Sequence, residues 1–224
     1  MRKLSYALTI ILLISFIVFT IIVKCVDVKS VGVDETKIGL STFNLSIKDR
    51  TPYNESWYKL TKYLGYLWFV VCGIFAGYGI YLFIKNKSLK KIDYKLYILF
   101  SIFLLAIIFY IAFEFIKINY RPIILDGKKE LSYPSSHTFL SISIFVPSAL
   151  YIIDSKFNKI IKYISVPLLL VLAILIVVGR FLSGVHWATD IIGGIILGSF
   201  LISLYISIDT FLENKFNKED ELEE

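Results

Sequence analysis

The chain has 224 residues, 57% of them hydrophobic, and a mean hydropathy of +0.72. A soluble domain of this size would carry polar faces at helical spacing, but the long runs here are apolar nearly all round. The net charge of +6 is spread along the chain and forms no single basic stripe. The composition therefore indicates an integral membrane protein whose partner is the lipid bilayer, and we expect no nucleic-acid partner.

Six apolar runs approach the roughly 20 residues that a helix needs to cross a bilayer. Pro147 and Pro167 interrupt the fourth and fifth runs. The first run follows two basic residues, as a signal peptide would, but it is too long for a typical signal core and no small-residue cleavage site follows it. We therefore predict an all-α polytopic membrane protein, a six-helix bundle in one domain (1–224). The predicted spans are 4–23, 64–84, 95–116, 138–153, 163–179 and 188–208.

Two further segments and the cysteines complete this outline. Residues 24–62 are polar and mixed in charge, and predict an outer loop that forms a cap or a short amphipathic segment. The acidic end of the chain, 209–224, predicts a solvated cytoplasmic tail. Cys25 and Cys72 fall in or beside different spans without metal spacing, so we expect isolated thiols.

The basic residues predict an orientation in the membrane. Lys and Arg are dense in two short loops, near 85–95 and 154–162. The positive-inside rule gives most weight to such short loops, so we expect both termini in the cytoplasm. The high content of Ile, Lys and Asn is typical of an AT-rich bacterial genome, which favours a bacterial plasma membrane.

Three polar segments contain both histidines of the chain. The first opens at Arg121 after the third span, the second is 133–137 before the fourth span, and the third, 179–190, joins the last two spans. Because adjacent spans run in opposite directions, all three segments emerge on the same membrane face. The charge pattern makes this the outer face, and residues 70 positions apart can meet there in one site.

The residue types in these segments suit phosphoryl transfer. Arginine binds phosphate through a planar, permanently charged fork, so Arg121 and Arg180 are candidate phosphate ligands. Ser135, Ser136 and the backbone N–H groups at the start of the fourth span can add donors, helped by the helix dipole. No cysteine or acidic cluster has metal-ligand spacing, so we expect catalysis without a metal or another cofactor.

The two histidines suggest different roles. His186 and Asp190 are four residues apart, and a helix that starts near Val185 would place them on one face. The carboxylate would then hold the imidazole in orientation while its other nitrogen attacks phosphorus. His137 would be the general acid, a role typically worth about 10²–10⁴-fold in rate. Each motif alone is more often structural, but together on one face they favour a catalytic site.

These residues resemble the type 2 phosphatidic acid phosphatase (PAP2) superfamily, which includes lipid phosphatases and vanadium haloperoxidases. Its three motifs are K-x6-R-P, P-S-G-H and S-R-x5-H-x3-D, and the similarity covers about 114–190. The matching residues are Arg121 and Pro122; Pro134, Ser135 and His137; and Arg180, His186 and Asp190.

The resemblance implies a metal-independent hydrolase of lipid phosphates or pyrophosphates. It implies a phosphohistidine on His186, orientation by Asp190, and acid catalysis by His137. It also implies that Arg121, Arg180 and Ser135 hold the phosphate. Substrates of the membrane branch include phosphatidic acid, phosphatidylglycerol phosphate and undecaprenyl pyrophosphate.

The chain departs from the family pattern at three positions. Glu114 stands where the first motif has its lysine, Ser136 replaces a glycine, and Gly179 replaces a serine. A carboxylate cannot bind phosphate as a cation does, and Lys117, one helical turn further on, can supply the missing charge. Alternatively, Glu114 pairs with Lys117 or Arg121 and positions them. We therefore expect Glu114 to modulate substrate preference.

Two other functions stay open at this stage. A catalytically degenerate relative would act as a transporter or scaffold, with its charges marking a substrate path. A lipid phosphotransferase would use an alcohol in place of water to release the phosphoryl group. The charges gather at one rim of the predicted bundle, which favours a catalytic pocket.

Overall fold

The structure, a computed structural model, describes residues 2–125 and 127–223, with side chains over 4–125 and 127–216. Short elements form one end of the molecule: β1 (Lys29–Ser30), η1 (Val33–Glu35), β2 (Lys37–Ile38) and α2 (Ser41–Lys48). The long helices are α1 (Arg2–Cys25), α3 (Glu55–Gly65), α4 (Leu67–Asn86), α5 (Tyr94–Phe115), α6 (Ser136–Asp154), α7 (Lys159–Leu182) and α8 (Ala188–Glu223). The turn η2 (Leu89–Lys91) connects α4 to α5.

The six predicted spans are confirmed within the described residues. Six helical stretches there are long and apolar enough to cross a membrane. Their outer surfaces expose large apolar side chains, as lipid contact requires, among them Ile14, Phe69, Ile107 and Ile164. The chain is therefore a polytopic, all-α membrane protein.

The second span begins earlier than predicted. Helix α3 starts at Glu55, and with α4 it forms a stretch from Glu55 to Asn86, whereas the sequence predicts a loop up to residue 62. The cause is local, because Asn54 caps α3 by accepting a hydrogen bond from the Trp57 N–H at 3.1 Å. The segment predicted as a tail continues α8, which is helical to Glu223. The tail's side chains beyond residue 216 lie outside those described.

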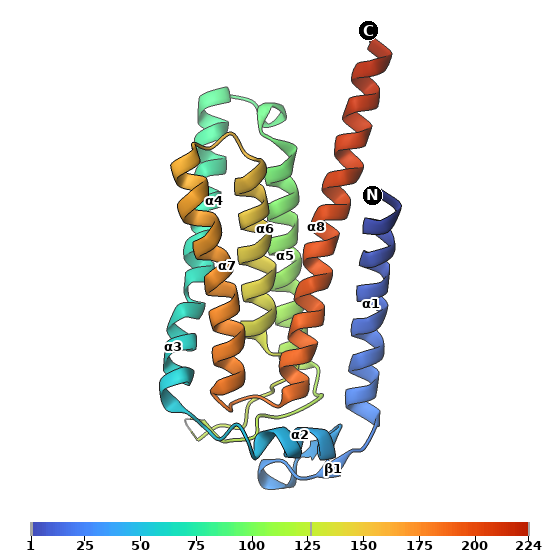
Figure 1. Cartoon of the computed structure of the whole chain (residues 1–224), viewed down its shortest axis with the longest axis vertical. Coiled ribbons are helices and arrows are strands. Elements are labelled where there is room, and N and C mark those ends of the chain that lie inside the picture. Colours follow the sequence, from blue (N-terminus) through green and yellow to red (C-terminus); the bar gives the residue numbers. More distant parts are fainter. Residues whose placement is uncertain (1, 126, 224) are drawn as a thin grey trace.

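Helix α6 lies inside the bundle among α4, α5, α7 and α8, and α1 runs along α8 (Figure 1). Glycines on α8 let it approach α6 closely: a Cβ at Gly194 would lie 2.9 Å from Thr138 Cβ, and one at Gly198 would lie 2.6 Å from Ile142 Cγ2. Such small-residue contacts are typical of helix pairs in membranes. Helix α1 is joined to α8 by hydroxyl hydrogen bonds of 2.8 and 2.9 Å from Thr9 to Ser203 and Ser207.

Both termini lie at one end of the bundle, and the cap of residues 26–54 covers the other end (Figure 1). Strands β1 and β2 form an antiparallel pair within this cap. The cap is joined to the start of α8 by Asn44, whose side chain donates to Thr189 Oγ1 at 3.0 Å and accepts from the Thr189 N–H at 3.2 Å. The cap therefore fixes the end of the bundle where the predicted catalytic segments lie.

Candidate active site

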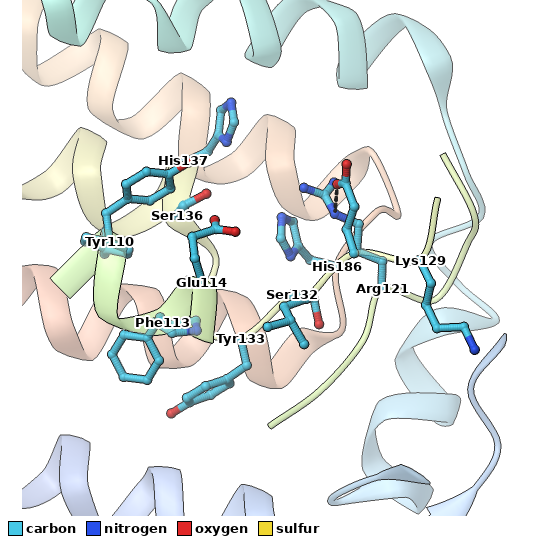
Figure 2. A pocket seen from close by; sticks show the side chains of 14 residues that line it. Tyr110, Phe113, Glu114, Arg121, Lys129, Ser132, Tyr133, Ser136, His137 and His186 are labelled. Atoms are coloured by element: carbon cyan, nitrogen blue, oxygen red, sulfur yellow. Dashed lines mark ion pairs between the residues drawn. The ribbon is translucent and has the colours of Figure 1, made fainter. Parts of the chain in front are cut away.

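The three polar segments meet beneath the cap around one cavity of about 480 Å³. The Ser135 N–H donates to the Asp190 carbonyl at 2.9 Å, which joins the segment before α6 to the first turn of α8. Figure 2 shows Arg121, Ser136, His137 and His186 around this cavity. The predicted convergence of distant residues on one membrane face is therefore observed.

Arg121 lies in the long loop between α5 and α6. The backbone N–H of Arg121 donates to the Glu130 carbonyl at 3.0 Å. The side-chain Nε lies 3.0 Å from Glu130 Oε2 (Figure 2). Among the described residues, Arg121 Nη1 has no hydrogen-bond partner although it is buried. One part of the guanidinium is thus fixed by Glu130, and another part is free to bind a ligand in the cavity.

Arg180 is a buried cation near the end of α7, only 1% exposed. Its Nη2 lies 2.9 Å from His137 Nδ1, and its Nη1 donates weakly to Thr61 Oγ1 at 3.5 Å. The guanidinium also sits 5.4 Å from the centre of the Tyr58 ring, within cation–π range. Because Arg180 makes no ion pair in the described part of the chain, its charge is available to an anionic ligand.

His186 and Asp190 are close together, but not in the way the sequence predicts. Helix α8 starts at Ala188, in agreement with the predicted span 188–208, so the helix start near Val185 that would place both residues on one helical face is not observed and His186 lies before the helix. Asp190 is the third residue of α8, and its Oδ2 accepts the Trp187 N–H at 2.9 Å, as in a capping box. His186 Nδ1 still lies 3.6 Å from the same oxygen.

Asp190 is fully buried and held by a second donor. Asn119 Nδ2 donates to Asp190 Oδ1 at 3.3 Å, and the carboxylate therefore has a fixed position beside the imidazole. Such a fixed carboxylate can orient a histidine and stabilise positive charge on its ring.

The environment of His186 keeps its imidazole neutral. Burial, and then the positive charges of Arg121 and Arg180, hold the pKa of His186 well below its ordinary value. A neutral imidazole retains a lone pair on one nitrogen and can act as a nucleophile. Because Nδ1 faces Asp190, Nε2 is the nitrogen available to the cavity.

His137 lies in the first turn of α6 and contacts Arg180. A guanidinium can only donate hydrogen bonds, so His137 Nδ1 is the acceptor and the neutral ring carries its proton on Nε2. The ring also packs edge-on against Trp68, with centroids 4.9 Å apart. His137 can therefore offer an Nε2 proton to a group in the cavity.

The two serines of the second motif occupy different environments. Ser136 lines the cavity, whereas Ser135 is fully buried and its Oγ accepts a hydrogen bond from Thr138 Oγ1 at 3.0 Å. The start of α6 brings Ser136 and His137, together with the positive end of the helix, to the cavity.

The two charged candidates near the end of α5 are also placed differently. Glu114 lines the cavity, beside Tyr110. Lys117 is exposed and lines neither this cavity nor the groove described next. In the described residues no ion pair joins Glu114 to Lys117 or Arg121, and Arg121 pairs with Glu130 instead.

An apolar groove of about 490 Å³ adjoins the polar cavity. Tyr110, Ser136 and His137 line both spaces. Helices α4, α5 and α6 supply the groove's apolar walls, which include Phe69, Cys72, Ile107, Ile111, Leu140 and Ile144. The site therefore combines a polar end with an apolar space between α4, α5 and α6.

Sequence reasoning missed several residues that build the site. Asn119 holds Asp190, Thr61 contacts Arg180, and Lys62 lines the groove beside His137. The signal for Asn119 is weak: it is a polar residue two positions before Arg121, after a long apolar run. Thr61 and Lys62 fall in a segment that the sequence presents as a loop.

Comparisons with known proteins agree with this geometry. Residues 114–212 match the sequence profile of the PAP2 superfamily. A comparison with curated proteins gave no match. The fold is similar to the crystal structure of a transmembrane PAP2-type phosphatidylglycerolphosphate phosphatase from Bacillus subtilis, with a TM-score of 0.62 and 17% identity over 91% of this chain and 96% of that chain. The region that carries the three motifs therefore matches the PAP2 superfamily, and the whole chain has a fold similar to that of a membrane PAP2-type phosphatase.

Proposed function

We propose that this protein is a membrane phosphatase that hydrolyses a lipid phosphate or pyrophosphate. One observation carries the proposal: Arg121 and His186, whose buried nitrogens have no hydrogen-bond partner among the described residues, line a cavity that joins an apolar groove. The buried Arg180 contacts His137 of the same cavity, and its Nε is also unpartnered in the described part of the chain. Buried polar groups are nearly always paired, so these unpartnered donors favour the binding of a polar ligand. The cationic donors fit a phosphate, and the groove fits a hydrocarbon chain.

The reaction begins with attack by His186 Nε2 on the phosphorus atom. The new N–P bond forms as the bond from phosphorus to the leaving oxygen breaks. His137, which takes up a second proton when the anionic substrate binds, gives that oxygen its Nε2 proton and returns to a neutral ring. The arginines neutralise the charge that spreads over the other phosphate oxygens. Asp190, 3.6 Å from His186 Nδ1, stabilises the charged ring of the phosphohistidine.

Water completes the cycle. His137, now without its Nε2 proton, accepts a proton from the water molecule that attacks phosphorus. The N–P bond breaks, inorganic phosphate leaves, and both histidines return to their starting forms. No step requires a metal or another cofactor.

The location follows from the charge pattern. The basic loops near 85–95 and 154–162 are at the end of the bundle that holds both termini, opposite the site. The positive-inside rule places that end in the cytoplasm. The site is then on the outer face of a bacterial plasma membrane.

The test is phosphate release by purified protein in detergent, with and without a metal chelator. The substrates are phosphatidic acid, phosphatidylglycerol phosphate, the substrate named for the Bacillus protein, and undecaprenyl pyrophosphate. We expect release from at least one lipid, no loss with chelator, and no release by His186→Gln. Trapping of ³²P on wild type but not on His186→Gln would identify the phosphohistidine.

The alternatives give different results in the same assay. A transporter or scaffold would release no phosphate from any of these lipids, and this outcome would refute the proposal. A phosphotransferase would form a new phosphate ester when an acceptor alcohol is added, at the expense of free phosphate.

A further inference from the structure

Two departures from the motif pattern leave the site without one cation and one hydroxyl. Glu114 replaces the first-motif lysine and Gly179 replaces the serine before Arg180. Helix α3, which precedes the region matched by the family profile, contacts α7 at Gly179 and α6 at His137.

Helix α3 packs closely against α7 at Gly179. A Cβ at this position would lie 2.5 Å from Thr61 Cγ2 and 2.9 Å from Trp57 Cε3, so only glycine fits without movement. The close approach brings the Thr61 hydroxyl to Arg180 Nη1 at 3.5 Å. A hydroxyl from α3 thus stands beside the arginine that follows position 179.

The same helix packs against His137. A Cβ at Gly65 would lie 2.9 Å from His137 Cδ2 and 3.0 Å from Nε2. Lys62 is three residues before Gly65, so it lies on the same face of α3, one turn away. In agreement, Lys62 lines the groove together with His137 and Ser136.

The Tyr58 ring lies near both Lys62 and Arg180. Lys62 Nζ lies 5.8 Å from the centre of the Tyr58 ring, and Arg180 Cζ lies 5.4 Å from the same centre. In the described residues Lys62 makes no ion pair, whereas Lys59 on the same helix pairs with Glu55 at 2.7 Å. Two like charges beside one ring are most stable with an anion near both of them.

We infer that Lys62 binds the phosphate of the substrate and takes the place of the cation that position 114 has lost. This role rests on the proposed function. The ammonium contacts a phosphate oxygen on the His137 side of the cavity, while the arginines hold the others. The positive charge of the site has thus moved from α5 to α3, at the junction of cavity and groove.

The test compares Lys62→Met with Lys59→Met, in detergent, on the best lipid substrate. Loss of a charge-assisted hydrogen bond costs about 10–100-fold in affinity, so Lys62→Met should raise KM and the inhibition constant of inorganic phosphate by about that factor. Lys59→Met should change neither, and Lys62→Arg should keep most of the affinity. Adding Glu114→Lys to Lys62→Met should restore part of it, which a structural role for Lys62 would not explain.

Equal KM and equal phosphate inhibition for Lys62→Met and Lys59→Met, at matched melting temperature, would overturn the inference and leave the proposed function intact. If wild type hydrolyses no lipid phosphate, the proposed function fails, and calorimetric titration with inorganic orthovanadate then decides on Lys62. Weaker vanadate binding by Lys62→Met than by Lys59→Met would support the role, and equal binding would overturn it.

Discussion

Restoring the family's serine at position 179 should damage this protein. Gly179→Ser places a Cβ 2.5 Å from Thr61 Cγ2 and 2.9 Å from Trp57 Cε3, where ordinary carbon contacts begin near about 3.5 Å. Overpacking of this kind costs about 1–3 kcal/mol. For a chain of this size, that corresponds to a melting temperature lower by roughly 2–12 °C.

Activity should fall as well, because α3 must move away from α7. This movement displaces Thr61, Lys62 and the Tyr58 ring relative to Arg180 and His137. A misplacement of about 1 Å can cost about 100-fold in rate, so we expect kcat/KM to fall by about 10–100-fold.

The assay is thermal unfolding in detergent together with lipid phosphate hydrolysis. Gly73→Ser is the matched control, since a Cβ at that α4 position meets no atom within 4 Å. Thr61→Ser removes the nearest methyl group and keeps the hydroxyl, so the double variant should recover part of the lost stability. If Gly179→Ser is as stable and active as Gly73→Ser, the close packing of α3 does not hold the site together.

Three other predictions concern Asp190, His186 and Lys48. Asp190→Asn should reduce kcat by about 10²–10⁴-fold, because the carboxylate charge is lost. In addition, one of the two donors to Asp190, the Trp187 N–H or Asn119 Nδ2, would then face the amide NH₂ group. Kinetics near those of wild type would refute this role of Asp190. The lowered pKa of His186 means that the unfolded chain binds a proton that the folded chain does not, so stability should fall as pH decreases from about 6.5 towards the folded pKa. The melting temperature of wild type should therefore drop more steeply over this range than that of His186→Gln, and parallel curves would contradict the lowered pKa. Lys48→Met removes a hydrogen bond of 2.6 Å to the Gly184 carbonyl, two residues before His186. It should lower the free energy of unfolding by about 1–3 kcal/mol and also lower kcat. The exposed Lys29→Met is the control, and equal effects of the two variants would argue against a role for this hydrogen bond.

The membrane fold could be predicted from the sequence because its signal is local and repeated. Six apolar runs determine six spans, and alternation of direction brings Arg121, His137 and His186 to one face without any knowledge of packing. The pairing of His186 with Asp190 could be predicted from spacing, and the predicted span 188–208 begins where α8 does. That start depends on the hydrogen bond from the Trp187 N–H to Asp190, which competes with a longer helix.

The contribution of α3 could not be predicted in the same way. Residues 55–65 mix Glu55, Lys59 and Lys62 with aromatic side chains, and no apolar run marks them as part of a span. Their position depends on contacts with two other helices. Helix α7 allows a close approach because Gly179 has no side chain, and α6 contributes the ring of His137. Asn44 and Asn119 likewise find their partners only after the bundle has formed.

The hydrogen bonds of Asn44 and Thr61 determine the order in which the parts of the site can assemble during synthesis. Both residues leave the ribosome before α7 and α8, yet their partners Arg180 and Thr189 are carried by those last two helices. The cap and α3 can therefore make these contacts only after the hairpin of α7 and α8 has been synthesised. The site is then complete only after α8 has brought Asp190 beside His186 and Thr189 to Asn44 of the cap.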